Sequence, residues 1–166
     1  MIGQITGETI KSAVAKCIVQ NFTVDSVPPK VYKEQIVQGF TKPAFFIWII
    51  DLAQSPLLGN RLEQTYQMNV RYHIDEKDNN KYQKLSHIGI QLLEALRTIN
   101  VPIGVMQAGE LVEINKPVRG RQMNFQITDD VLQVFVTYTI KGYIPEQEQP
   151  NMQTLTVNEA SKVVSN

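Results

Sequence analysis

The stretch LEQTYQMNVRYHI, from Leu62 to Ile74, alternates apolar and polar side chains with a period of two. The apolar positions are Tyr66, Met68, Val70, Tyr72 and Ile74, and the polar positions between them are Gln67, Asn69, Arg71 and His73. This period is typical of a strand with one buried face and one solvent-exposed face. We therefore expect the fold to be built around a strand over residues 62–74, with an apolar layer on its buried side.

Two amphipathic helices are predicted to supply that layer. The first spans residues 6–20, with Thr6 as its N-cap and Cys17 on its apolar stripe, so Cys17 is interpreted as a small buried hydrophobe. The second spans residues 80–99 and follows the central strand directly. Its apolar face comprises Tyr82, Leu85, Gly89, Leu92, Leu96 and Ile99, widened by Ile88 and Leu93.

Two strands are predicted before the central one, over residues 30–37 and 44–52. The segment 44–52, AFFIWIIDL, is aromatic and β-branched with hardly a polar residue, so both of its faces should be at least partly covered. Trp48 within it is interpreted as core or as a subunit contact. Residues 54–60 are expected to form a loop to the central strand.

The second half of the chain predicts three further strands. Residues 104–114 indicate a short strand or hairpin that turns near Ala108-Gly109, and residues 123–127 and 132–140 indicate a hairpin broken by Asp129-Asp130. The element order is then α-β-β-β-α-β-β-β. We expect the α+β class, with a mainly antiparallel or mixed sheet covered by two helices.

Composition bounds the class of protein. The chain has 166 residues with 16 basic and 16 acidic side chains, so whole-molecule attraction to nucleic acid or to an anionic membrane is not expected. We expect one domain over residues 1–144 and a polar, proline-bounded extension over residues 145–166, either mobile or docked on a neighbour; Thr154–Val157 could add a strand there. The lysines near the N-terminus argue against a secretion signal, and no apolar run reaches the roughly 20 residues that a bilayer requires.

The residues give no sign of an active site. The histidines, His73 and His87, fall on polar faces and are interpreted as solvated, and Cys17 is the single cysteine, so neither a metal site nor an internal disulfide is predicted. Acidic pairs such as Asp75-Glu76 lie in predicted turns, where backbone geometry explains them. We predict a protein that is not an enzyme, with no catalytic residues, cofactor or metal.

Several segments in order carry a family resemblance. After the N-terminal helix come VYKEQIVQGF from Val31 to Phe40 and PAFFI from Pro43 to Ile47, and later RGRQM from Arg119 to Met123 and DDVLQVFVTY from Asp129 to Tyr138. Over about residues 5–142 the chain resembles the tail terminator family of tailed bacteriophages and phage-like contractile particles. The resemblance implies an α/β sandwich that assembles as a hexameric ring on the last ring of the tail tube, stops tube polymerisation and receives the head.

The resemblance also implies partners and a location. The partners would be further copies of the chain, the tail tube protein, the head–tail connector and, in contractile particles, the sheath, with DNA only as passing cargo and no membrane. The protein would be part of the virion tail and assemble in the cytoplasm of the bacterial host. Two alternatives remain open: another head–tail joining or completion protein, and a small enzyme that recruits Tyr72, His73 or Cys17.

Contacts with these partners are expected in three loops, over residues 54–61, 75–80 and 115–122. The candidate interface residues are Leu57, Leu58, Arg61, Asp75, Glu76, Lys116, Arg119 and Arg121. The leucines would otherwise tuck back onto the domain, and the basic residues would otherwise be solvated. The basic loop suits phosphates or carboxylates as ligands.

Overall fold

The structure is a computed structural model that describes residues 5–22, 28–33, 38–75, 77 and 79–143. Its elements are α1 (Gly7–Asn21), β1 (Lys30–Tyr32), β2 (Ala44–Leu57), β3 (Arg61–His73), α2 (Lys81–Ala95), β4 (Thr98–Gln107), β5 (Glu110–Thr128) and β6 (Val131–Tyr143). The predicted α-β-β-β-α-β-β-β order and the α+β class are confirmed. Residues 34–37 and the extension 145–166, including Thr154–Val157, lie outside the described residues.

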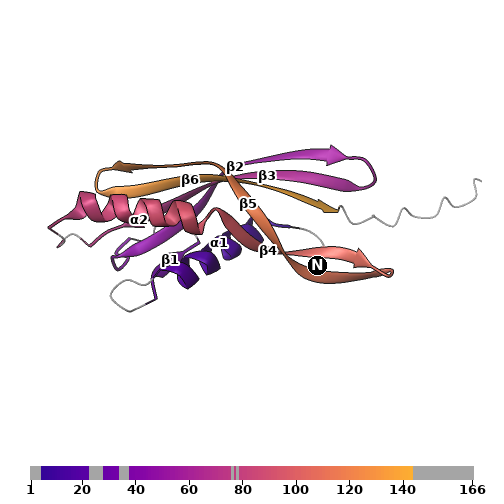
Figure 1. Ribbon diagram of the computed structural model, residues 1–166, viewed down its shortest axis with the longest axis horizontal. Helices are drawn as coiled ribbons and strands as arrows, with labels where there is room; N and C mark the ends of the chain where they lie inside the picture. Colours follow the sequence, from indigo (N-terminus) through magenta and orange to yellow (C-terminus); the bar gives the residue numbers. More distant parts are fainter. Residues whose placement is uncertain (1–4, 23–27, 34–37, 76, 78, 144–166) are drawn as a thin grey trace, which may run out of the picture.

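A single mixed sheet runs through the molecule in the order β1-β2-β3-β6-β5-β4. β1 pairs with β2 in parallel, and every other pairing is antiparallel. Both helices lie on one side of the sheet (Figure 1), where α1 contacts β2 and β4 and α2 contacts β5 and β6. The opposite side of the sheet carries no helix in this described part.

The hydrophobic core lies between the sheet and the two helices. The central strand contributes Tyr66, Met68, Val70 and Tyr72, all buried as its period predicted. From the helices come Ile10, Val14, Ile18, Leu85 and Leu92, from the C-cap of α2 comes Leu96, and from β6 come Leu132, Val134, Val136, Tyr138 and Ile140. Thr6 caps α1 by accepting a hydrogen bond from the Thr9 backbone N–H at 3.3 Å, as predicted.

The second helix ends earlier than predicted. α2 stops at Ala95, and Ile99 lies on β4 paired with Val118. The helical spacing of apolar residues includes Leu96 and Ile99, and both are buried. Ile99, however, is buried as a residue of β4, which begins at Thr98. Tyr82 was also placed wrongly, since it is 73% exposed in the first turn of α2.

Two predicted loops are strands. β2 does not stop at residue 52 but continues to Leu57, shifting register between Ile49 and Asp51, and only residues 58–60 form the turn into β3. Residues 115–122 belong to β5, which is continuous from Glu110 to Thr128. Pro56 and Pro117 fall in these two predicted loops, yet each lies where its strand pairs on one side only among the described residues, and a missing N–H is tolerated there.

β5 changes its partner along its length. It pairs with β4 through Arg119 and with β6 from Gly120 onward. Two hairpins therefore diverge from the core at one end of the molecule (Figure 1). We call them the first arm, residues 51–67 with the end of β6, and the second arm, residues 103–114.

Candidate interaction surfaces

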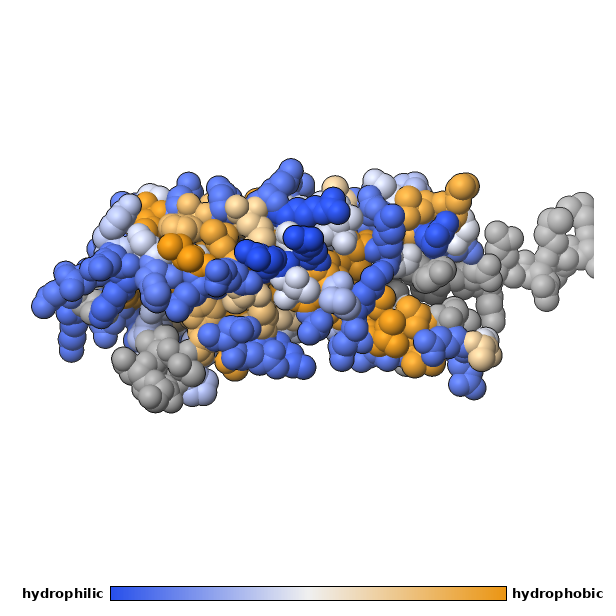
Figure 2. All heavy atoms as spheres, viewed as in Figure 1, coloured by the Kyte–Doolittle hydropathy of each residue, from blue (hydrophilic) through white to orange (hydrophobic). Residues whose placement is uncertain are grey.

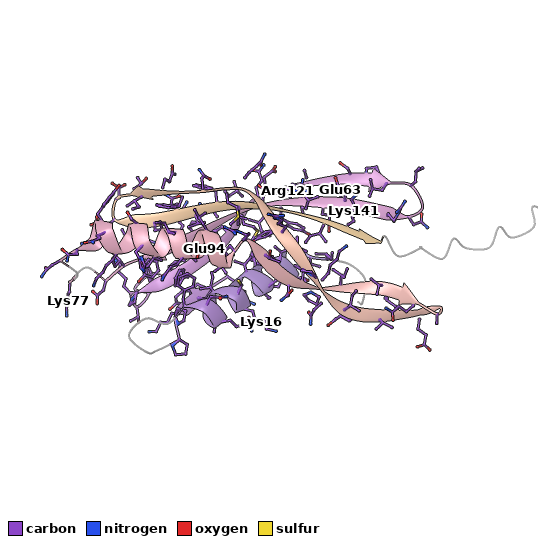
Figure 3. All side chains as sticks on the ribbon, viewed as in Figure 1. Lys16, Glu63, Lys77, Glu94, Arg121 and Lys141 are labelled. Carbon is purple, nitrogen blue, oxygen red and sulfur yellow. The ribbon has the colours of Figure 1, made fainter. Side chains whose placement is uncertain are left out.

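A basic groove lies where the two arms separate. Its walls are β5 before Gly120 and β6 after Tyr138, since Gly120 and Tyr138 form the last pair before the strands part. The groove measures about 460 Å³, and its polar lining comprises Glu63, Lys116, Arg119, Arg121, Thr139 and Lys141. Figure 3 shows Arg121, Glu63 and Lys141 close to one another at this end of the molecule.

Positive charge in the groove is only partly neutralised. Lys141 Nζ lies 3.6 Å from Glu63 Oε2. Lys116, Arg119 and Arg121 are exposed, and none of them forms an ion pair with any residue that the structure describes. Four cations therefore face one carboxylate. Three of these cations were predicted from the sequence as members of a loop; the structure places them on a strand and adds Lys141 and Glu63.

The turn of the first arm holds the second group of candidates. Leu58 is 87% exposed at the tip, while Leu57 is partly buried as the last residue of β2. Arg61 Nε donates to the Leu58 carbonyl at 2.9 Å, and Gly59 and Asn60 have φ values of 70° and 53°. The hydrogen bond from Arg61 closes the turn, and the Leu58 side chain projects outward from it.

Asp75, the described member of the acidic pair, lies at the other end of the molecule. Asp75 is exposed, and its Oδ1 accepts from the Lys77 backbone N–H at 3.2 Å; Glu76 lies outside the described residues. Lys77 is far from Arg121 and Glu63 in Figure 3. The seven candidates that the structure describes thus fall on three surfaces, with the groove and the turn of the first arm toward one end and Asp75 at the other.

A fourth surface was missed in the sequence. On the side of the sheet that faces away from both helices, the Arg71 guanidinium lies 4.0 Å from the centroid of the Trp48 ring, and Arg71 Nε donates to Asn69 Oδ1 at 3.0 Å. Asn69 was predicted to be solvated, but only 2% of it is exposed. The alternation had assigned Asn69 and Arg71 to one face. That Trp48 lies opposite Asn69 depends on strand register, which the sequence did not give.

The residues named for an enzyme do not converge. Cys17 Sγ donates to the Ala95 carbonyl at 3.1 Å, and burial raises the pKa of its thiol. His73, predicted to be solvated, packs edge-on against Phe40 and Phe46, and burial lowers its pKa, followed by the nearby charges of Lys42 and Arg71. Tyr72 is buried in the core. Each contact is one that packing explains.

Within the described ranges, no three His, Cys, Asp or Glu side chains are grouped in a way that could hold a metal ion. No helix of that same part is long and apolar enough to cross a membrane.

Comparison with known proteins gives one informative match. The model of a family described as phage tail terminator protein matches residues 9–151, most of the chain. The match runs beyond the segments quoted above and includes the first residues of the extension. A search of curated proteins returned no match. One solved structure, whose title states no function, aligns over 87% of this chain and 100% of its own, with 13% identity and a TM-score of 0.34, a likeness too low to support an argument.

Proposed function

Since this chain belongs to the phage tail terminator family, we propose that it closes a completed tail tube by assembling on it as a hexameric ring. A structural, tail-terminating role, association with other tail components and a place in the virion follow from the family. The proposal adds the ring, its seat on the tube, and its use as the surface for the head connector and, in contractile particles, the sheath. The match over residues 9–151 is the observation that carries it.

Ring closure requires two different complementary surfaces on each subunit, because a head-to-tail contact is repeated through a fixed rotation. The sheet offers two unlike strand edges. β2 from Asp51 to Leu57 pairs with β3 alone, and β4 pairs with β5 alone, among the residues described here. An open edge is a template for pairing with another chain. We propose that one edge of each subunit meets the other edge of the next.

The two arms offer a surface for contact with the tail tube. Leu58 is exposed on the first arm, and Leu111, Val112 and Ile114 are exposed on the second. Figure 2 shows apolar patches over the distal parts of both hairpins. Exposed apolar groups at one end of a molecule are typical of an interaction site. We propose that this end contacts the last tube ring, leaving the end with Asp75 and Lys77 for the connector.

Deletion of the gene for this chain from the genome that encodes the particle tests the terminating role directly. Without a terminator, electron microscopy should show tubes of uncontrolled length and no joined heads, and expression of the wild-type chain in trans should restore the normal length. Leu58→Asp should fold normally by circular dichroism but fail to restore it. Tubes of normal length in the deletion would refute the terminating role. Native mass spectrometry of the chain on isolated tubes would refute the hexamer if six copies per tube end were not found.

A further inference from the structure

The basic groove is shaped for an extended segment. Among the residues that the structure describes, β5 before Gly120 and β6 after Tyr138 each pair with a strand on their outer side only, so each presents to the groove an edge that no described strand covers. Such edges offer N–H and C=O groups to an added strand, and side chains along them select its sequence. A compact ligand would not form strand-type hydrogen bonds along these two edges.

The charge of the groove selects an acidic partner. Lys116, Arg119 and Arg121 have no anionic partner in the described part of the chain, and Lys141 shares only Glu63. Arginine side chains recognise carboxylates with two parallel hydrogen bonds. The expected occupant is therefore an extended segment that carries carboxylates at alternate positions.

The chain itself contains a segment of that chemistry. PEQEQP, from Pro145 to Pro150, places Glu146 and Glu148 two residues apart, so in an extended conformation both project from the same side. Proline at both ends disfavours a helix. The whole extension, residues 145–166, has three glutamates and one lysine, which complements the excess of cations in the groove.

We propose that the groove of one subunit binds Glu146 and Glu148 of the adjoining subunit, so that the extension ties neighbours together around the ring. This inference rests on the proposed ring. An extension of the same subunit would have to reverse its direction after Tyr143 to enter the groove, because β6 runs outward past the groove lining at Thr139, Ile140 and Lys141. A neighbour's extension needs no reversal, and its 22 residues, 145–166, span up to about 70 Å when extended.

Charge exchange tests the contact in the full-length protein. The groove variant carries Arg119→Glu and Arg121→Glu, the extension variant carries Glu146→Lys and Glu148→Lys, and a quadruple variant carries all four. Lys16→Glu with Lys30→Glu is the matched control, because it makes the same charge change at exposed positions outside the groove. Ring formation on isolated tubes is measured by native mass spectrometry, after circular dichroism has shown that each variant folds.

Each two-site variant alone should form at least tenfold fewer rings than wild type. An equal mixture of the groove and extension variants should recover them, because alternating subunits restore opposite charges at every contact; the quadruple variant should recover as well. Recovery in the quadruple variant but not in the mixture would place the extension in its own subunit and overturn the proposal. Undiminished rings in either two-site variant, or equal loss in the control, would also overturn it.

A peptide assay separates this contact from the ring itself. A fluorescent peptide of residues 144–152 should bind the wild-type chain saturably, bind the groove variant at least tenfold more weakly, and lose affinity with added salt. If the peptide bound but no ring formed, the groove would still be the binding site of the extension, and the proposed ring would be refuted. Ring formation with neither peptide binding nor recovery in the charge-exchanged variants would refute the groove assignment and leave the proposed ring unaffected. Tighter binding of a duplex DNA oligonucleotide, lost in the groove variant, would assign the groove to nucleic acid and overturn the proposal.

Discussion

Gly120 sits at the point where the two arms separate, and Gly120→Ala should destabilise the fold. A Cβ there would lie 2.8 Å from Val136 Cγ2, 2.9 Å from the Leu96 carbonyl oxygen and 3.1 Å from Met123 Sδ. The carbonyl cannot easily retreat, because Tyr138 Oη donates to it at 2.7 Å. Gly120 is itself tied down by its N–H, which donates to the Arg97 carbonyl at 2.8 Å.

The magnitude follows from two opposing effects. Overpacking by one methyl group in a rigid site costs about 1–3 kcal/mol, and the upper value applies here because a backbone atom is in the way. Replacing glycine also stabilises by about 0.4–1 kcal/mol through the unfolded chain. The net loss should be about 2 kcal/mol, which lowers Tm by roughly 4–8 °C for a domain of this size.

Gly142→Ala is the matched control for this measurement. Gly142 also lies in a strand, and its added Cβ would meet only Ile5 Cδ1 at 3.8 Å, an ordinary van der Waals distance. That variant should therefore keep or slightly raise the stability. Urea unfolding followed by tryptophan fluorescence gives both free energies. If Gly120→Ala lost no more stability than Gly142→Ala, the tight joint between the arms would be refuted.

Three other side chains, those of Tyr138, His73 and Cys17, give further predictions. Tyr138→Phe removes the hydrogen bond to Leu96 and should cost about 1–2 kcal/mol in urea unfolding, and an unchanged midpoint would contradict the role given to that bond. The pKa of His73 is lowered from 6.5 in the folded chain, so the unfolded chain binds the proton more readily and stability should fall as pH drops below about 6.5; His73→Gln should flatten this dependence between pH 8 and pH 5, and the same slope in both proteins would count against it. Burial raises the pKa of Cys17, so iodoacetamide should label the folded chain at pH 8 far more slowly than the urea-unfolded chain, whereas equal rates would show an exposed thiol.

The sequence predicted those features that depend on the burial of one face. The period of residues 62–74 located the central strand, and the stripe through Leu85, Gly89 and Leu92 located α2, because a buried face imposes its own spacing. The residue at which α2 ends was harder to predict from the sequence. Leu96 and Ile99 are both buried, one at the helix C-cap and the other on a strand, and burial alone does not distinguish the two.

Interaction surfaces were harder to predict because they depend on which strands pair. Arg119 and Arg121 were recognised as a basic cluster, but Lys141 joins them only because β5 leaves β6 at Gly120, next to the end of β6. Trp48 and Arg71 meet only through the register of β2 and β3. Neither relation leaves a local signal in the chain.

The same partner change explains why β5 resembled a loop. A strand paired on both sides excludes proline, and a long strand without interruption rarely contains both proline and glycine. β5 tolerates Pro117 because its second edge faces the groove rather than a described strand. It requires Gly120 because the Leu96 carbonyl and the side chains of Val136 and Met123 converge where β5 joins β6. The residues that argued against a strand therefore mark the place where one sheet divides into two arms. At that division, two strand edges without a partner among the described residues line the groove, and the cations lie along them, which is the arrangement that the proposed contact with a second chain requires.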